Sequence, residues 1–279
     1  YGTYVTTPSV SEDKAEIRIM TTLENELKKV QTVSISHLIL DNQGKIVAKS
    51  GTEKTLFEAG QSIKITQNLT LNYPRLWTLE KPELYTLETT VKANGKVTDL
   101  YKTPFGIRTI AFDSEKGFLL NGKQVKLKGM CLHQDAGSLG TAVLDRSYER
   151  RLEIIKEYGC NAIRCSHNQP SPEFLDMCDR MGFVVIDEAF DKWKSGYYEK
   201  YFDEWWQRDL ENMILRDRNH PSIILWSIGN EVTEAWEQGN EGIKRAEMLR
   251  DFVHKLEPSR PVTLAAQNNH RGEFSAVAD

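Results

Sequence analysis

The second half of this chain repeats one unit four times: a short, mostly apolar run, then a longer segment with apolar residues at helical spacing. A strand that is apolar along its length must be covered on both faces, as in a parallel sheet packed against its connecting helices. The alternation begins near Val125 and predicts parallel β/α architecture. The expected strands are 125–132, 161–165, 183–188, 222–228 and 261–266, and the expected helices are 147–159, 171–182, 203–217 and 240–258.

Four complete units and a fifth strand fit either part of a (β/α)8 TIM barrel or a doubly wound sheet. The first strand is not followed by the glycine-rich loop of a doubly wound nucleotide-binding sheet. Polar residues gather just after the strand ends, which is where barrel enzymes hold their catalytic groups. We therefore predict an α/β domain over residues 109–279 that is the first part of a TIM barrel.

Residues 1–108 show the period of two that is typical of half-buried strands. The run 30–41 alternates with one slip between Ile35 and Leu38, which a β-bulge would absorb. Asn94-Gly95 is a strong hairpin signal. Short alternating strands over about 100 residues predict an all-β, immunoglobulin-like sandwich, which we interpret as a packing or spacing module.

Composition narrows the classes of partner. The net charge is −4 without a long basic run, which argues against nucleic acid or an anionic membrane. No segment approaches the roughly 20 apolar residues of a membrane helix. The compartment stays open. The cysteines form no CxxC pair, so we expect buried free thiols at Cys131, Cys160, Cys165 and Cys178.

Four predicted strand ends carry polar residues, and in a parallel barrel these ends share one rim. Taken singly, each has a structural interpretation: Arg164 could pair with Asp187 or Glu188 inside the barrel. Their joint placement favours an active site. The residues are His133, Gln134 and Asp135 after the first strand, Arg164 to Asn168 at the second, Asp187, Glu188, Asp191 and Trp193 at the third, and Asn230 and Glu231 at the fourth.

Two long segments resemble the sequence signatures of glycoside hydrolase family 2. They are "NAIRCSHNQPSPEFLDMCDRMGFVVIDE" (161–188) and "DRNHPSIILWSIGNE" (217–231). Residues 106–137 resemble the family's lead-in to its barrel, and 75–91 the end of its immunoglobulin-like domain. The family cleaves terminal β-galactosides, β-glucuronides or β-mannosides with retention of configuration.

The resemblance implies roles for individual residues. Glu231 matches the general acid/base, and Asn230 the amide that bonds the sugar's 2-hydroxyl. Glu231 follows a buried strand that contains Trp226, where desolvation would favour its protonated form. The other expected substrate-binding residues are His133 and His167 in the sugar pocket, Arg164 as support for the nucleophile, Asp187 and Glu188 at the third strand end, and Trp193 as a stacking face.

The resemblance also implies parts that this chain does not contain. The family's nucleophile is a second glutamate near the seventh strand, and Glu273 comes too early to match it. We expect an internal fragment that is inactive alone and that self-associates or is marginally stable. We expect no cofactor: some members place Glu and His magnesium ligands after the third strand, and the loop 187–196 has neither after Glu188.

Several functions remain open. The first is a retaining exo-β-glycosidase for terminal, non-reducing β-D-galactose of an oligosaccharide or glycoconjugate, in a chain that could form homo-oligomers. A β-glucuronidase of the same family is the alternative. A non-catalytic carbohydrate-binding relic would be expected to lose Asn230 or Glu231, and both are present. An interaction module would leave the polar strand ends unexplained.

Overall fold

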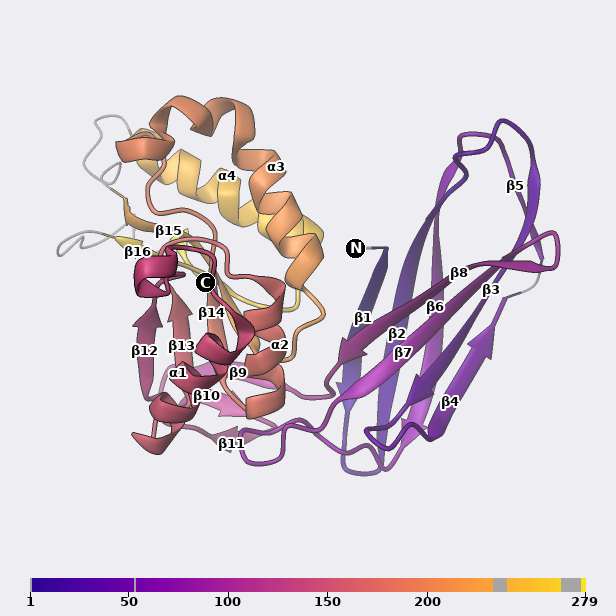
Figure 1. The fold of residues 1–279 in the computed structure, drawn as a ribbon, viewed down its shortest axis with the longest axis horizontal. Helices are drawn as coiled ribbons and strands as arrows, with labels where there is room; N and C mark the ends of the chain where they lie inside the picture. Colours follow the sequence, from indigo (N-terminus) through magenta and orange to yellow (C-terminus); the bar gives the residue numbers. More distant parts are fainter. Residues whose placement is uncertain (1, 53, 233–239, 267–276) are drawn as a thin grey trace. The chain divides into compact units, whose positions relative to one another are not determined.

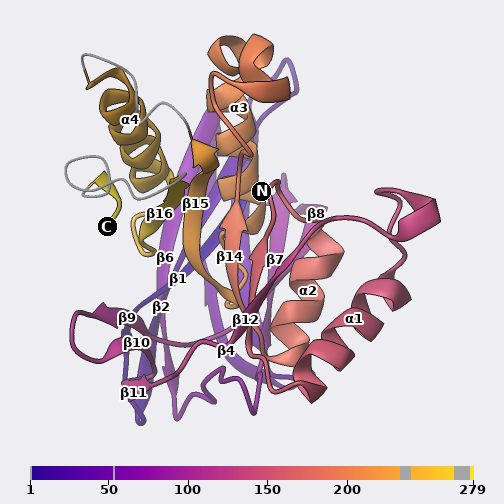
Figure 2. The same ribbon diagram turned by 90° about the vertical axis from the view of Figure 1, so that its left-hand side faces the viewer.

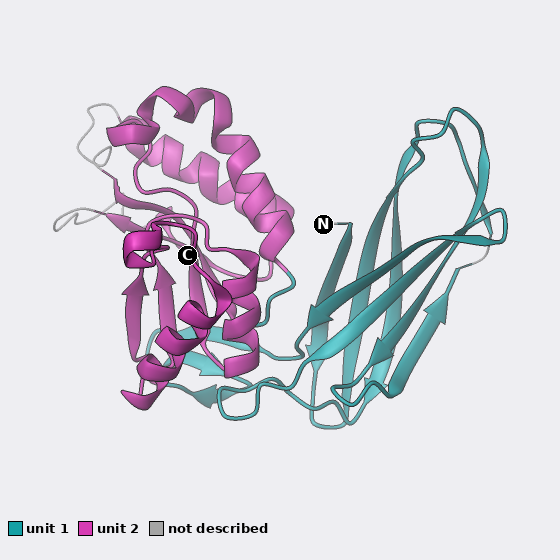
Figure 3. Cartoon of the chain, in the orientation of Figure 1, with its two compact units in different colours: residues 1–125, 219–221 teal, residues 126–218, 222–279 magenta. Residues whose placement is uncertain are grey.

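The computed structural model describes residues 2–52, 54–232, 240–266 and 277–279. The chain divides into two compact units (Figure 3). The first comprises residues 1–125 with 219–221, and the second comprises 126–218 with 222–279. By this division the segment 109–125, predicted with the barrel, clusters with the first unit.

The first unit is built from antiparallel sheets (Figure 1). One has the strand order β1-β2-β6 and the other β4-β3-β7-β8, with β5 paired to β3. A small sheet of order β11-β10-β9 follows. The strands are β1 (Thr3–Val10), β2 (Lys14–Glu24), β3 (Gln31–Leu40), β4 (Ile46–Gly51), β5 (Thr55–Phe57), β6 (Ser62–Asn72), β7 (Tyr85–Ala93), β8 (Lys96–Phe105), β9 (Ile110–Asp113), β10 (Gly117–Leu120) and β11 (Lys123–Gln124).

The bulge expected between Ile35 and Leu38 is absent from the pairing of β3 with β7. This pairing runs from Val33 to Leu40 without a shift, and every second residue of β3 is buried throughout. The inward position after Ile35 is filled by His37 rather than by Leu38. The imidazole Nδ1 lies 3.0 Å from the hydroxyl oxygen of Thr89 on β7. His37, a polar residue with a hydrogen-bond partner, therefore keeps the alternation of buried and exposed residues intact. The sequence suggested a slip only because this inward position is not apolar.

The sandwich should lose stability on acidification because of His37. Burial lowers the pKa of His37 from 6.5 to about 4. Between these values the unfolded chain binds a proton that the folded chain does not, so stability that is present above pH 6.5 is lost as the pH falls toward 4, by about 2–3 kcal/mol. Urea unfolding at a series of pH values should show this slope. His37→Gln should flatten it and the control His254→Gln should not, and equal slopes in the parent and His37→Gln would contradict the assignment.

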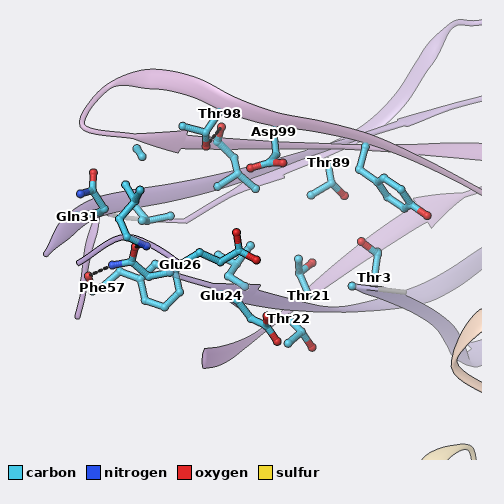
Figure 4. A pocket seen from close by; sticks show the side chains of 18 residues that line it. Thr3, Thr21, Thr22, Glu24, Glu26, Gln31, Phe57, Thr89, Thr98 and Asp99 are labelled. Atoms are coloured by element: carbon cyan, nitrogen blue, oxygen red, sulfur yellow. Dashed lines mark hydrogen bonds between the residues drawn. The ribbon is translucent and has the colours of Figure 1, made fainter. Parts of the chain in front are cut away.

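A cavity of about 490 Å³ lies in the first unit, lined by residues from both sheets (Figure 4). Threonine is the commonest residue of its lining, which also includes the carboxyl groups of Glu24, Glu26 and Asp99. The amide of Asn25 in the same lining donates to the carbonyl oxygens of Phe57 and Glu58, at 3.0 and 2.9 Å. The Asn25 amide thus joins the segment after β2 to the end of β5. This agrees with a structural role for the first unit.

The second unit contains one parallel sheet with its strands in chain order, β12-β13-β14-β15-β16 (Figures 1 and 2). A doubly wound sheet reverses its order at a switch point, so this order supports the predicted partial barrel. No described helix is long and apolar enough to cross a membrane. The elements are β12 (Gly129–Leu132), η1 (Gly137–Leu139), α1 (Asp145–Glu157), β13 (Ala162–Cys165), α2 (Pro172–Met181), β14 (Val184–Glu188), η2 (Gly196–Tyr198), α3 (Glu199–Asp217), β15 (Ile223–Val232), α4 (Glu241–Leu256) and β16 (Val262–Ala266).

Helix α2 shows how the sequence sets its own boundaries. The Ser171 hydroxyl accepts a hydrogen bond from the backbone N–H of Phe174, at 3.3 Å, and Pro172 occupies the first turn. Gly182 ends the helix with φ of 71°, a conformation that glycine adopts without a Cβ penalty. These capping signals explain why the predicted and observed helix agree closely.

The two faces of the parallel sheet have different environments. One face packs on the helices through a continuous apolar core that includes Ile163, Val185 and Trp226. The alternating residues Arg164, Glu188 and Ser227 bond to one another on the opposite face. The cysteines are free, as predicted; Cys165 and Cys178 are buried, Cys160 is half-buried, and Cys131 is exposed. Burial of all four was therefore a wrong expectation.

Candidate active site

The ends of β13, β14 and β15 bring a group of charged and amide side chains together on the sheet face opposite the helices. Glu188, the last residue of β14, is fully buried. The Arg164 guanidinium donates to it through Nε–Oε2 at 3.0 Å and through Nη2 to Oε1 and Oε2 at 3.0 and 2.8 Å. The Ser227 hydroxyl donates at 2.7 Å, and the Nδ1 atom of His167 lies 2.9 Å from Oε1. These partners satisfy a carboxylate that burial would otherwise destabilise.

Arg164 is the hub of this network. Burial acts to lower the pKa of Arg164, but the hydrogen bonds and charge of Glu188 outweigh it, so the pKa is raised. The same Nη2 atom also donates to the side-chain oxygen of Asn230 at 2.7 Å. One guanidinium therefore links the ends of all three strands, because its rigid fork can serve two acceptors at once.

The orientation of the Asn230 amide follows from its two partners. Its oxygen faces Arg164, which can only donate, and its nitrogen donates to the Asp191 carboxylate at 2.9 Å. The Asn230 backbone N–H also donates to the Asp191 carbonyl, at 2.8 Å. Asn230 is buried in this arrangement, with an exposed fraction of 4%. Asn230 is thus held in a single position at the end of β15.

Glu231 follows Asn230 with φ of +46°, which is uncommon for a residue with a Cβ and costs about 1–2 kcal/mol. The expected desolvation near Trp226 is wrong. The Trp226 indole is fully buried and donates to Glu257 at 2.9 Å, whereas the Glu231 side chain is 55% exposed. The strained backbone therefore aims the carboxyl group outward from the strand end instead of into the core.

Lys192 joins the site although the sequence did not single it out. Its ammonium lies 3.1 Å from each oxygen of Asp191 and 3.2 Å from Oε2 of Glu231. Burial acts to lower the pKa of Lys192, but its bonds to the two carboxylates raise it overall. For Asp191, burial acts to raise the pKa, and the bonds from Asn230 and Lys192 lower it overall. The signal that could have found this pair is an Asp-Lys dipeptide three residues after a buried strand that ends in an acid.

The two histidines predicted for the sugar pocket lie together. Their ring centroids are 5.1 Å apart with the planes at 85°, an edge-to-face arrangement. His133 is exposed, and His167 is half-buried against Glu188. His167 therefore adjoins the network and His133 adjoins His167, while their place in a sugar pocket stays a prediction. Glu273 lies outside the described residues.

Asp187 corrects the prediction that both acids of β14 belong to the site. It pairs in register with Trp226, on the opposite face of the strand from Glu188. It is fully buried, and neither carboxyl oxygen has a hydrogen-bond partner among the described residues. Burial raises the pKa of Asp187 well above its usual value, and the charge of Asp217 raises it further. Asp187 therefore belongs to the layer between the sheet and the helices and does not face the site.

Trp193 is likewise not a stacking face. It is fully buried, and its indole N–H donates to the Ile228 carbonyl at 2.7 Å. A Cβ built on Gly229 would lie 2.8 Å from that indole nitrogen. Glycine is therefore required before Asn230 because the Trp193 indole and a Val232 methyl group, 2.7 Å from the same added Cβ, leave no room for a side chain. Trp193 therefore packs against the backbone at the end of β15, and its buried ring leaves no face on which a sugar could stack.

The residues after β14 do not fit a magnesium ion. Such an ion is bound through carboxylate oxygens and water. Asp191 and Glu231 are the acids that could supply such oxygens at this strand end. The Lys192 ammonium lies between their carboxylates, within 3.2 Å of an oxygen of each. A bound dication would be repelled by this cation.

Comparison with known proteins identifies the family. Residues 112–278 match the model described as "Glycosyl hydrolases family 2, TIM barrel domain", and residues 2–108 match "Glycosyl hydrolases family 2". The chain belongs to glycosyl hydrolase family 2. This confirms the resemblance and the predicted fold class of a β-sandwich followed by part of a TIM barrel.

Relatives within family 2 carry two kinds of name. The chain is 45% identical to "Beta-galactosidase BoGH2A" of Bacteroides ovatus, over 98% of this chain and 36% of that protein. It is 30% identical to a "Beta-glucuronidase" of Bacteroides fragilis, over 100% of this chain and 40% of that protein. A solved family 2 structure from Bacteroides cellulosilyticus matches with a TM-score of 0.95 and 40% identity, over 100% of this chain and 36% of that one. The chain thus spans little more than a third of these relatives.

Proposed function

We propose that the protein containing this chain is a retaining exo-β-galactosidase in which Glu231 is the general acid/base. The observation that carries the proposal is the end of β15, where a rigidly held amide directly precedes an outward-facing carboxyl group. Asn230 is fixed by Arg164 and Asp191, and the Glu231 side chain is 55% exposed. The name of the Bacteroides ovatus relative supports galactose as the sugar.

The reaction proceeds in two steps. A carboxylate nucleophile that is not among the described residues attacks the anomeric carbon, and Glu231 gives its proton to the departing aglycone oxygen. In the second step the Glu231 carboxylate takes a proton from water, which attacks the glycosyl-enzyme and restores the free sugar with the β configuration. The amide of Asn230 bonds the 2-hydroxyl, and His133 and His167 border the sugar.

Glucuronate is the alternative sugar, because several relatives are named β-glucuronidases. The test is hydrolysis of a panel of aryl β-glycosides by a chain extended to the length of these relatives, with the 279-residue chain alone in parallel. We expect the β-galactoside to be cleaved fastest by the extended chain and no turnover by the shorter one. Faster cleavage of the β-glucuronide would replace the galactosidase assignment. If the extended chain cleaved no glycoside but bound galactose, the carbohydrate-binding relic would be the better interpretation.

A further inference from the structure

We propose that Lys192 is a positioning residue that fixes the orientation of Glu231 and holds a positive charge beside its carboxyl group. This inference rests on the proposed role of Glu231 and adds a residue that neither the sequence motifs nor the family roles assign. Its basis is one contact network at the end of β15, in which a single ammonium bridges two carboxylates.

The network closes into a ring. The amide nitrogen of Asn230 donates to Asp191 at 2.9 Å, and Asp191 accepts from Lys192 at 3.1 Å. Lys192 then donates to Glu231 at 3.2 Å, and Glu231 is the residue after Asn230. A surface lysine is usually free to move between several partners. Here the ammonium is fixed to the same strand end that carries the acid it contacts, so its position relative to Glu231 is determined.

The donor count separates this role from recognition of an acidic sugar. An ammonium has three N–H donors and no acceptor. Within the described part of the chain, the ammonium of Lys192 bonds both oxygens of Asp191 and Oε2 of Glu231. The Lys192 side chain is only 26% exposed. The carboxylate of a glucuronide substrate would therefore have to displace a protein carboxylate from Lys192. This argues that Lys192 is a partner of Glu231 and that it does not bind glucuronate.

The charge has a definite effect on the proposed chemistry. Lys192 places one positive charge 3.2 Å from Oε2 of Glu231, so removal of that charge should show in the pH dependence of catalysis. Among the described residues, the other charged or titratable groups at this end of the sheet are Asp191, which precedes Lys192, the Arg164–Glu188 pair next to Asn230, and the histidines His133 and His167. Residues Ala265 and Ala266 of β16, which pair with this part of β15, carry no charge.

The first test is the pH profile of kcat/KM for a phenyl β-galactoside, measured on the extended chain. Lys192→Met removes the ammonium, leaves Asp191 facing Glu231, and should move the basic limb upward by about half a pH unit, as suits one partly exposed pair. Lys192→Arg keeps the charge and should retain the parent profile. The matched control is Lys194→Met, on the same loop, whose ammonium pairs with Asp203 instead. An unmoved basic limb in Lys192→Met, or a rise in KM alone, would overturn the inference.

The second test does not depend on hydrolysis and uses the 279-residue chain. The NMR signal of the Lys192 Cε atom should report protonation of each carboxyl group bonded to the ammonium as the pH is lowered. Glu231→Gln should remove one step of that titration and leave the step due to Asp191, whose pKa is lowered. If Glu231→Gln keeps the parent's titration, the inference fails even where the galactosidase assignment stands. If the step disappears but no glycoside is cleaved, the pairing stands and the proposed function fails.

Discussion

Replacing Glu231 with alanine should reduce kcat for a phenyl β-galactoside by about 10²–10⁴-fold in the extended chain, which is the usual contribution of a general acid/base. A poor leaving group needs its oxygen protonated as the glycosidic bond breaks. A dinitrophenyl galactoside needs much less help, so its glycosyl-enzyme should still form and then hydrolyse slowly. Comparing the two substrates in the parent and Glu231→Ala measures the acid role directly.

Azide separates loss of the acid/base from loss of the fold. The azide anion needs no general base, and the shortened side chain leaves room for it beside the anomeric carbon. Azide should therefore restore turnover of the activated substrate in Glu231→Ala and yield a β-galactosyl azide. The control Glu241→Ala removes an exposed acid at the start of α4 that pairs with Lys244, and it should match the parent. Equal activity of Glu231→Ala and the parent would show that Glu231 is not the acid/base.

Replacing Arg164 with methionine should lower the free energy of unfolding by about 3–5 kcal/mol, as expected when one partner of a buried ion pair is removed. Glu188 is fully buried and would keep only its contacts with Ser227 and His167. The measurement is urea unfolding followed by tryptophan fluorescence, because five of the six tryptophans come after residue 126. Arg164→Lys keeps the charge without the fork and should lose less.

Two further variants isolate the cause. Arg151→Met breaks the exposed pair with Asp135 and should change stability by less than about 1 kcal/mol. Combining Arg164→Met with Glu188→Gln removes the unpaired charge and should recover part of the loss, which a double-mutant cycle quantifies. If Arg164→Met is no more destabilising than Arg151→Met, the ion pair is not a major source of stability in this unit.

The elements that sequence alone could predict are those with a strong local signal. The period of the apolar residues separates strands from helices, and the caps of α2 mark its ends. The two family motifs placed Arg164, His167, Glu188 and Asn230 at neighbouring strand ends, and the structure brings them together. A strand's period of two also implies that adjacent residues face opposite ways, so one of Asp187 and Glu188 had to point away from the site.

Only the tertiary structure decided between alternatives that the sequence pattern allows equally. Which acid of β14 faces Arg164 depends on register with β15, and it is Glu188. Whether a tryptophan in a loop stacks on a sugar or supports a backbone depends on what packs around it, and Trp193 packs on Gly229. The inward place of His37 and the bridge from Lys192 to Glu231 arise from residues that are distant in sequence. Local propensity and periodicity set the elements of this chain, whereas the environment of each ionisable group, and hence its chemistry, is set by neighbours that only the folded chain supplies.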